Sequence, residues 1–478
     1  MTSGSVAAPG AGGTAVLRNR AFLLLWLSQV ATQIGGNMVL YGLTVVVLEA
    51  TDLSSAVSGL FLTFLLPSVL FSALAGVYVD RIDRRIVLVA TNVLRAVILG
   101  GVFLVGNNIG LVLLLTIAFA TVTVFFAPAE AAMIPELVPR DQLTAANGLF
   151  TLTLNGAFAL GYALLGPLIV TLSGGPEPVI VVVAILFAVA AVFCFTLPKN
   201  PPAPHVAPGP LGRVTEAGQA VGGTISQLRE GIDYIRAHGT IGWTLVYLGI
   251  AASLVGVIGV LGPKFAQQTL GLNPKDLIVV VLPLGIGIVF GVLVLNNYGR
   301  FIRRRRAIEG GLIVLGVLLS ILTVAGPVSR LLQGVGGNVK LVDLSAVTSL
   351  IAVVTMLAFL SGVAYGIVAI SSQTQLQEDL PEEVRGRVFG VLNMLVSVAS
   401  ILPIIIVGPI SDLVGTTAVI LAIAIAVALS GIVSIVSRGP LEAGPPTDVP
   451  GLRLAGTPVD PVGATLQVHD PHDEEPRA

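Results

Sequence analysis

The chain has few charged residues. Asp, Glu, Lys and Arg make up 11% of its 478 residues, whereas hydrophobic residues make up 55%. A soluble globular protein carries roughly 25% charged residues, and the mean hydropathy of this chain is +0.96. This composition excludes an ordinary soluble domain and predicts a polytopic, all-α membrane protein. The formal net charge of -1 also argues against a nucleic-acid partner.

Cysteine and histidine are scarce as well. The single cysteine, Cys194, lies inside an apolar run, which excludes a disulfide framework and a metal site built from cysteines. The four histidines all lie outside the predicted membrane spans; they are His205, His238, His469 and His472. The sequence contains no recognisable set of nucleophile and base. We therefore expect neither a metal nor a cofactor, and the residues argue against an enzyme.

What the chain has in abundance is long apolar runs. About 20 apolar residues cross a hydrocarbon core roughly 30 Å thick. Twelve such runs occur, at about 21–47, 55–79, 85–106, 109–131, 143–173, 178–197, 241–263, 277–299, 307–327, 346–374, 384–411 and 414–437. We expect an N-terminal six-helix bundle at 18–197, a linker at 198–239 and a second bundle at 240–437. Polar composition predicts disorder at 1–17 and 438–478.

Positive charges are unevenly distributed between the loops. Of the 25 Lys and Arg residues, 20 fall on one side of the predicted spans and Arg95 lies inside a span; those on the other side are Lys264, Lys275, Arg330 and Lys340. Because positively charged loops stay in the cytoplasm, both termini and the linker are predicted to be cytoplasmic, in a bacterial plasma membrane. The linker also carries apolar residues at helical spacing, which predict an interfacial helix: Ile225, Leu228, Ile232 and Ile235.

A short polar loop joins the second and third spans. It reads Gly76-Val-Tyr-Val-Asp80-Arg81-Ile-Asp83-Arg84-Arg85, and so many charges cannot lie in hydrocarbon. The spacing Gly-x-x-x-Asp-Arg-x-x-Arg-Arg resembles the loop between helices 2 and 3 of the major facilitator superfamily of secondary transporters. The resemblance implies twelve helices in two six-helix bundles, with transport by alternating access.

The same resemblance implies a role for Asp80. In this superfamily the aspartate of the motif faces the start of the eleventh span, here Glu383 to Arg387. A helix start presents free N–H groups and a positive dipole, so this contact would latch the two halves while the cytoplasmic side is closed. A charge run that only sets topology is the alternative. The predicted latch residues are Gly76, Asp80, Arg81, Arg84, Arg85, Arg385 and Arg387.

Two further loops narrow the resemblance to one branch. The segments Pro128-Ala-Glu130 through Asn147 and Gln377 through Gly390 are similar to loops of the enterobactin-exporter and macrolide-efflux branch. Gly166-Pro167 in the fifth span matches part of the exporters' glycine–proline pattern, which permits close helix contact and a bend. This branch implies efflux of drug-like, macrolide-like or siderophore-like molecules by proton antiport. The protein is expected to be a monomer in contact with membrane lipid. An importer or lysolipid flippase on the same fold is one alternative, and a transport-inactive sensor or scaffold is another.

Polar residues share one face of the first span. Trp26, Gln29, Gln33, Asn37 and Tyr41 recur at spacings of three and four. Amides facing lipid would lack partners, so this stripe is predicted to line the substrate pathway; hydrogen bonding between helices is the alternative. Further pathway candidates are Thr121, Asn155, Trp243, Tyr247, Tyr365, Asn393 and Ser397.

Ionisable residues inside the spans are rare. Arg95 lies about ten residues, or roughly 15 Å, into the third span; its side chain can extend toward the cytoplasm, where a structural ion pair with Glu130 is expected. Both Glu130 and Glu309 lie near the predicted inner ends of spans, and Asp412 lies near an outer end. No carboxylate is evident that would carry a proton, and an uncharged, apolar pathway suits a hydrophobic or amphipathic solute.

Overall fold

The computed structural model describes residues 16–106, 108–199, 239–271, 278–299, 303–325, 327, 349–379 and 400–438. Within these ranges all regular structure is helical. The predictions of a disordered N-terminus, of an interfacial helix in the linker and of a disordered tail concern mainly residues outside these ranges. The described chain begins at Val16, whose side chain is buried.

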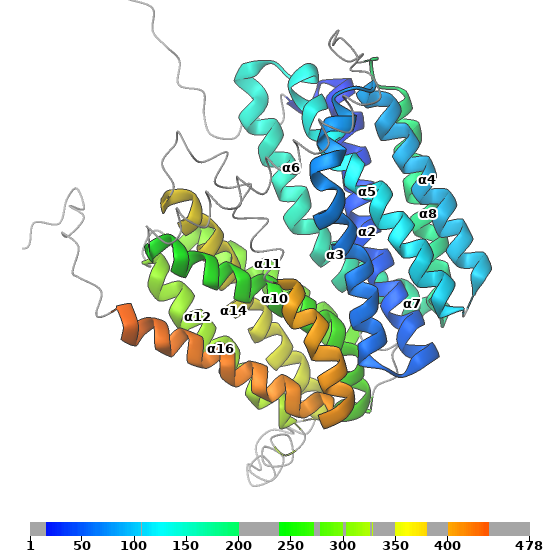
Figure 1. The fold of residues 1–478 in the computed structure, drawn as a ribbon. Helices are drawn as coiled ribbons and strands as arrows, with labels where there is room; N and C mark the ends of the chain where they lie inside the picture. Colours follow the sequence, from blue (N-terminus) through cyan, green and yellow to red (C-terminus); the bar gives the residue numbers. More distant parts are fainter. Residues whose placement is uncertain are drawn as a thin grey trace, which may run out of the picture. The chain divides into compact units, whose positions relative to one another are not determined.

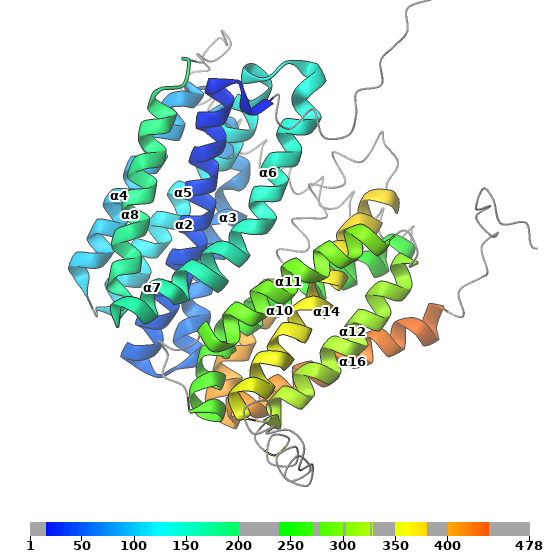
Figure 2. The same cartoon turned by 180° about the vertical axis from the view of Figure 1, so that it is seen from behind.

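The first half of the chain contributes a bundle of membrane helices. These are α2 (Arg20–Thr51), α3 (Ser54–Val79), α4 (Arg84–Val105), α5 (Ile109–Leu137), a fifth segment of α6 (Leu143–Ala157), η2 (Phe158–Leu165) and α7 (Gly166–Ser173), and α8 (Glu177–Phe195). A short 3-10 turn, η1 (Arg140–Gln142), precedes α6, and η2 is π-helical. The helices lie side by side in both views (Figures 1 and 2).

The second half forms a similar group. It consists of α10 (Gly239–Leu270), α11 (Ile278–Tyr298), α12 (Arg304–Thr323), α14 (Leu350–Asp379), the helix Ser400–Val414 and α16 (Thr416–Arg438). Of the helices in the described ranges, 11 are long and apolar enough to cross a membrane, and Ser400–Val414 is shorter. That helix covers the end of the predicted span 384–411, whose first part is not described. A helical fold with many spans is therefore confirmed, and the count of twelve stays a prediction.

The apolar core runs from one half into the other. Leu60 and Phe61 of α3 belong to the same cluster of buried side chains as Leu261 of α10 and Ile404. Many outward-facing residues are apolar too, among them Leu104, which is 84% exposed. Such broad apolar exposure fits a surface solvated by lipid. Both groups of helices belong to one compact unit that extends to Ser437.

Three helices of the first half, α2, α4 and α5, begin with a polar cap of their own. The Asn19 side chain accepts hydrogen bonds from the first N–H groups of α2, and Asp83 and Asn108 do the same for α4 and α5. Helix α3 differs, because Leu53 at its start offers no side-chain cap. The free N–H groups of α3 must therefore be satisfied from elsewhere.

Candidate functional site

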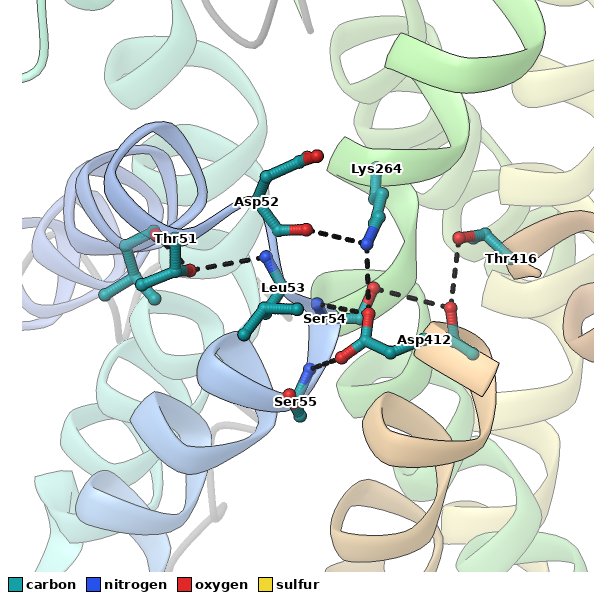
Figure 3. A network of polar contacts seen from close by, with 10 residues as sticks. Thr51, Asp52, Leu53, Ser54, Ser55, Lys264, Asp412 and Thr416 are labelled. Atoms are coloured by element: carbon teal, nitrogen blue, oxygen red, sulfur yellow. Dashed lines mark hydrogen bonds and ion pairs between the residues drawn. The ribbon is translucent and has the colours of Figure 1, made fainter. Parts of the chain in front are cut away.

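A polar cluster, which we call the clasp, joins the two halves (Figure 3). It consists of Asp52, Ser54 and Ser55 from the first half and Lys264 and Asp412 from the second. Lys264 Nζ lies 3.0 Å from Asp412 Oδ1 and donates a 2.7 Å hydrogen bond to the backbone oxygen of Asp52. The backbone N–H groups of Ser54 and Ser55 each donate to the Asp412 carboxylate over 2.9 Å. One ion pair thus bridges α10 and helix Ser400–Val414 and also holds the turn between α2 and α3.

The clasp completes two helix ends that their own side chains leave open. Helix α2 ends at Thr51, and its C-terminal cap residue Asp52 has a left-handed backbone with φ of 51°. The last carbonyls of a helix carry partial negative charge, so the Lys264 ammonium is favourable there. Helix α3 begins at Ser54, and the Asp412 carboxylate lies at its positive end. Each charge of the pair therefore contacts both its counterion and a helix end whose partial charge is opposite to its own.

Close packing brings the two halves into this contact. A Cβ atom on Gly408 would lie 2.6 Å from the backbone oxygen of Ser54, so only glycine lets its helix approach α3 so closely. The Lys264 and Asp412 side chains are 8% and 14% exposed. Shielding from water makes such a pair stronger than a pair on an open surface.

Asp412 follows the last residue of the predicted eleventh span, and its ionisation is strongly favoured. Burial raises the pKa of its carboxyl group, but the hydrogen bonds from Ser55, Lys264 and Ser54 outweigh burial and lower the pKa to about 2. The sequence places Lys264 and Asp412 on the same predicted side of the membrane but does not predict their pairing. They are 148 positions apart, and no spacing rule relates residues at such a separation.

The polar stripe of α2 divides between two environments. Trp26 Nε1 donates a 3.0 Å hydrogen bond to Thr153 Oγ1, and Gln29 Nε2 lies 3.5 Å from the backbone oxygen of Phe150. Both partners belong to α6, so the start of the stripe makes the helix–helix hydrogen bonds that were the alternative to pathway lining. Asn37 Nδ2 donates to the backbone oxygen of Gln33 within α2 over 2.9 Å.

The end of the stripe faces a cavity shared by both halves. Tyr41 packs edge-on against Tyr162 of η2, with ring centroids 5.5 Å apart. Both rings line a cavity of about 60 Å³, together with Leu284 and Tyr365 from the second half. A water molecule takes up about 30 Å³ in the liquid, so no drug-sized molecule fits at this level. The structure thus brings Tyr41 and Tyr365 together, as lining of a narrow apolar space.

A much larger apolar cavity lies in the second half. It has a volume of about 990 Å³ and is lined by α10, the helix Ser400–Val414 and α16. Small-molecule sites commonly measure about 300–1,000 Å³. Among the lining residues that the structure describes, Ser253 is the only one with a polar side chain, and the lining residues Leu402 and Val414 are 62% and 61% exposed. This space fits an apolar ligand better than a polar one.

Thr121 lies on α5, whereas Trp243 and Tyr247 lie on α10. Thr121 donates to the Ile117 carbonyl oxygen of its own helix over 2.7 Å. The rings of Trp243 and Tyr247 lie 6.0 Å apart at the start of α10, and the Tyr247 hydroxyl is hydrogen-bonded to Ser434. The Asn155 side chain and the residues Asn393 and Ser397 lie outside the described part of the chain.

The charged loop between α3 and α4 has the tight turn that the sequence predicts. Gly76 is in the last turns of α3, and Asp80 follows as an exposed C-terminal cap residue. Arg84 Nη1 lies 3.6 Å from Glu136 Oε1 of α5, and the Arg85 guanidinium lies 4.8 Å from the centre of the Phe195 ring. Because Arg385 and Arg387 fall outside the described ranges, the contact of this loop with the eleventh span stays a prediction.

Arg95 is held by neutral partners. It is 2% exposed, and its Nη2 donates a 2.7 Å hydrogen bond to Asn92 Oδ1. The guanidinium lies 4.4 Å and 4.6 Å from the ring centres of Phe126 and Phe187, a cation–π arrangement on two sides. The predicted ion pair with Glu130 is not among the contacts of the described residues. The aromatic faces and the amide already supply the contacts that the guanidinium needs.

Two glutamates are buried within the bundles, which the sequence analysis does not predict. Glu130 is 6% exposed because α5 continues to Leu137, beyond the predicted span end at residue 131. Glu309 is 3% exposed in the first turns of α12. Its Oε1 accepts hydrogen bonds from Arg305 Nε at 2.8 Å and from Ser434 Oγ at 2.6 Å. The sequence shows that both glutamates lie near the ends of spans. It does not show which helices pack over their side chains.

Gly166 and Pro167 stand where π-helical η2 passes into α7. Gly166 is in close contact with α2, because a Cβ atom there would lie 3.1 Å from the Tyr41 side chain. Pro167 occupies the first turn of α7, where a missing N–H is tolerated. The predicted close helix contact is therefore found at the level of the Tyr41 cavity.

Comparison with known proteins agrees with this architecture. The chain is 25% identical over 431 residues to the multidrug efflux pump Tap of Mycobacterium tuberculosis (strain ATCC 25618 / H37Rv), covering 87% of this chain and 93% of that protein. It is 23% identical over 404 residues to macrolide efflux protein A of Streptococcus pyogenes, covering 82% of this chain and 90% of that protein.

Solved structures with the same fold belong to other transporters. The crystal structure of the nucleoside transporter NupG aligns with a TM-score of 0.63 at 12% identity, covering 88% of this chain and 100% of NupG. A bacterial homologue of the human lysosomal transporter Spinster, inward-facing and occupied, aligns with a TM-score of 0.63 at 13% identity, covering 88% and 97%. The sequence profile of the Major Facilitator Superfamily matches residues 25–404. With its helical spans and these relatives, the chain belongs to the Major Facilitator Superfamily.

Proposed function

We propose that this protein is a secondary active transporter that works by alternating access and exports hydrophobic or amphipathic small molecules in exchange for protons. The observation that carries the proposal is the clasp. Its ion pair and its two helix-end contacts join the halves through side-chain and turn atoms. Such contacts can open and re-form while both bundles keep their helices, which alternating access requires.

An open apolar cavity in the second half supports a hydrophobic substrate. The cavity of about 990 Å³ offers one polar side chain, Ser253, among its described lining residues. The similar proteins from Mycobacterium and Streptococcus are described as multidrug and macrolide efflux proteins. We therefore favour uncharged or amphipathic solutes of macrolide-like character, taken up from the membrane or the cytoplasm.

The positive-inside rule supplies the orientation. Both termini and the Asp80 loop are placed in the cytoplasm, and the clasp is then on the outer side. In this arrangement the clasp closes the outer end, and the Asp80 loop closes the inner end in the opposite state. The protein acts as a monomer in the bacterial plasma membrane.

Everted membrane vesicles test transport and its direction. A pH gradient, acid inside, should drive uptake of ethidium or erythromycin, and an uncoupler should abolish it. A siderophore and lysophosphatidylcholine belong in the panel, because accumulation of the lysolipid alone would favour the flippase alternative. Uptake only in right-side-out vesicles would indicate an importer, and absence of transport by correctly folded protein would contradict the proposal.

A variant tests the inner latch. Asp80→Asn should slow transport while leaving membrane insertion and abundance unchanged, because the amide has no charge to place at the start of the eleventh span. Asp141→Asn changes an exposed acid on the same predicted side and serves as the matched control. Equal transport rates in Asp80→Asn and wild type would remove the latch from the mechanism.

A further inference from the structure

The two buried glutamates differ in their contacts. Glu309 Oε1 accepts hydrogen bonds from Arg305 of its own helix and from Ser434 of α16, so this carboxylate has partners and helps to hold α12 against α16. Glu130 Oε1 is buried and has no hydrogen-bond partner among the described residues. An acidic group within a membrane helix is costly to bury without a partner and marks a functional position. Glu130 therefore needs an explanation that Glu309 does not.

The charged and titratable groups around Glu130 come from several helices. Arg95 of α4 and Cys194 of α8 interact with it electrostatically. Further along the same end of α5, Arg84 Nη1 lies 3.5 Å from the Ala132 carbonyl oxygen and pairs with Glu136. The Arg95 guanidinium has amide and aromatic contacts of its own, to Asn92, Phe126 and Phe187. The carboxylate can therefore gain or lose a proton without having to break an ion pair.

We propose that Glu130 carries the coupled proton, an assignment that rests on the proposed proton-driven export. In the step, a carboxylate oxygen of Glu130 forms an O–H bond with a proton taken from one side of the membrane. After the halves have reoriented, that bond breaks and the proton leaves to the other side. No other covalent bond changes, and no electron is transferred.

A chain of contacts connects this proton site to α2. Arg95 Nη2 donates to Asn92 Oδ1 over 2.7 Å, and Asn92 Nδ2 lies 3.6 Å from Cys194 Sγ. Cys194 Sγ in turn lies 3.1 Å from Ser28 Oγ of α2. Helix α2 carries the polar stripe and ends at Asp52 in the clasp. A proton on Glu130 changes the field acting on Arg95, and these contacts pass the change to the helix that both pathway and clasp share.

Proteoliposomes containing purified protein separate coupling from transport, with ethidium as the probe. Counterflow, in which labelled ethidium exchanges for unlabelled ethidium, needs reorientation but no pH gradient. Accumulation driven by a pH gradient needs coupling. We expect Glu130→Gln to keep counterflow and to lose gradient-driven accumulation. Glu130→Asp should recover part of the accumulation, and Asp141→Asn, a change of an exposed acid shortly after the end of α5, should behave as wild type.

Each outcome has one meaning. Absence of wild-type counterflow with every compound of the transport panel would overturn the proposed function itself. Wild-type counterflow without gradient-driven accumulation would overturn the proton exchange of the proposed function and the assignment with it. Full accumulation in Glu130→Gln, beside full accumulation in wild type, would overturn only the assignment of the proton to Glu130. If Glu130→Gln does not fold, infrared difference spectra of wild type upon ethidium binding should show a carboxyl C=O band that moves in Glu130→Asp. A band unchanged in Glu130→Asp would also reject the assignment.

Discussion

Lys264 and Asp412 meet at 3.0 Å although 148 positions separate them. Each also contacts the turn between α2 and α3, where Lys264 binds a carbonyl oxygen and Asp412 binds two N–H groups. The pair is therefore more than an ion bridge between helices of the second half. It holds the first half as well, and its loss frees a helix start and a helix end together.

Asp412→Ala should shift the protein toward states in which the clasp is open. Hydrogen bonds to a charged group contribute about 1.5–3 kcal/mol each, and 1.4 kcal/mol corresponds to about a tenfold change in an equilibrium. Ser58 lies buried on α3 against Gly408, so Ser58→Cys should react with a membrane-impermeant maleimide at least about tenfold faster when Asp412 is replaced. Labelling rates in intact cells measure this.

The control for that experiment is Glu177→Ala, which removes an exposed acid on the same predicted side. It should leave the labelling rate of Ser58→Cys unchanged. The native Cys194 is buried, and the parent protein without the added cysteine gives the background. Equal rates with and without Asp412 would mean that the clasp does not keep the halves together.

Exchanging the two charges should not restore the clasp. In the double variant Lys264→Asp/Asp412→Lys the ion pair can re-form, but a lysine at 412 cannot accept from the N–H groups of Ser54 and Ser55. An aspartate at 264 likewise cannot donate to the Asp52 carbonyl oxygen, and both helix ends face a charge of the wrong sign. We expect the double variant to unfold at a temperature no higher than either single variant, measured in detergent. Recovery to the wild-type temperature would show that charge pairing alone matters.

The clasp should not respond to pH in the physiological range. The pKa of Asp412 is lowered to about 2, below its ordinary value of 3.8. A lowered pKa means that the stabilisation is fully present above the ordinary value and is lost as the pH falls through the lowered one. Labelling of Ser58→Cys should therefore stay constant between about pH 5.5 and 8, apart from the known pH dependence of thiol reactivity. A change in clasp opening between these pH values would contradict the lowered pKa of Asp412.

Arg95→Lys should destabilise the first half although it keeps the charge. The flat guanidinium lies between the rings of Phe126 and Phe187 while donating to Asn92, and an ammonium group cannot reproduce this geometry. Desolvated cation–π contacts contribute about 2 kcal/mol. Thermal unfolding in detergent should show a lower midpoint for Arg95→Lys than for Arg140→Lys, a change of an exposed arginine. Similar midpoints would mean that the two aromatic contacts contribute little.

Arg95 also shows how far sequence reasoning reaches. Its depth in a span follows from counting residues, and that an arginine there needs partners follows from the cost of burying charge. The choice among partners depends on which side chains α5 and α8 bring near it. Nothing in the sequence distinguishes Phe126 and Phe187 from other apolar residues of the spans. The sequence therefore predicts Glu130 as the partner of Arg95 and does not predict its contacts with the two aromatic rings.

By itself the sequence determined the helical membrane fold, the places of the spans and the tight polar turn at Asp80, because hydrophobicity and charge act on each segment locally. It also marked the polar stripe of α2, since helical periodicity aligns residues within one helix. Only the tertiary structure decided that Asp412 caps α3 and that Tyr41 and Tyr365 line one narrow cavity. It also decided that, among the described residues, Glu130 Oε1 has no hydrogen-bond partner whereas Glu309 Oε1 has two. These relations depend on how distant helices pack, and packing is set by the shapes of many side chains together rather than by any one stretch of chain.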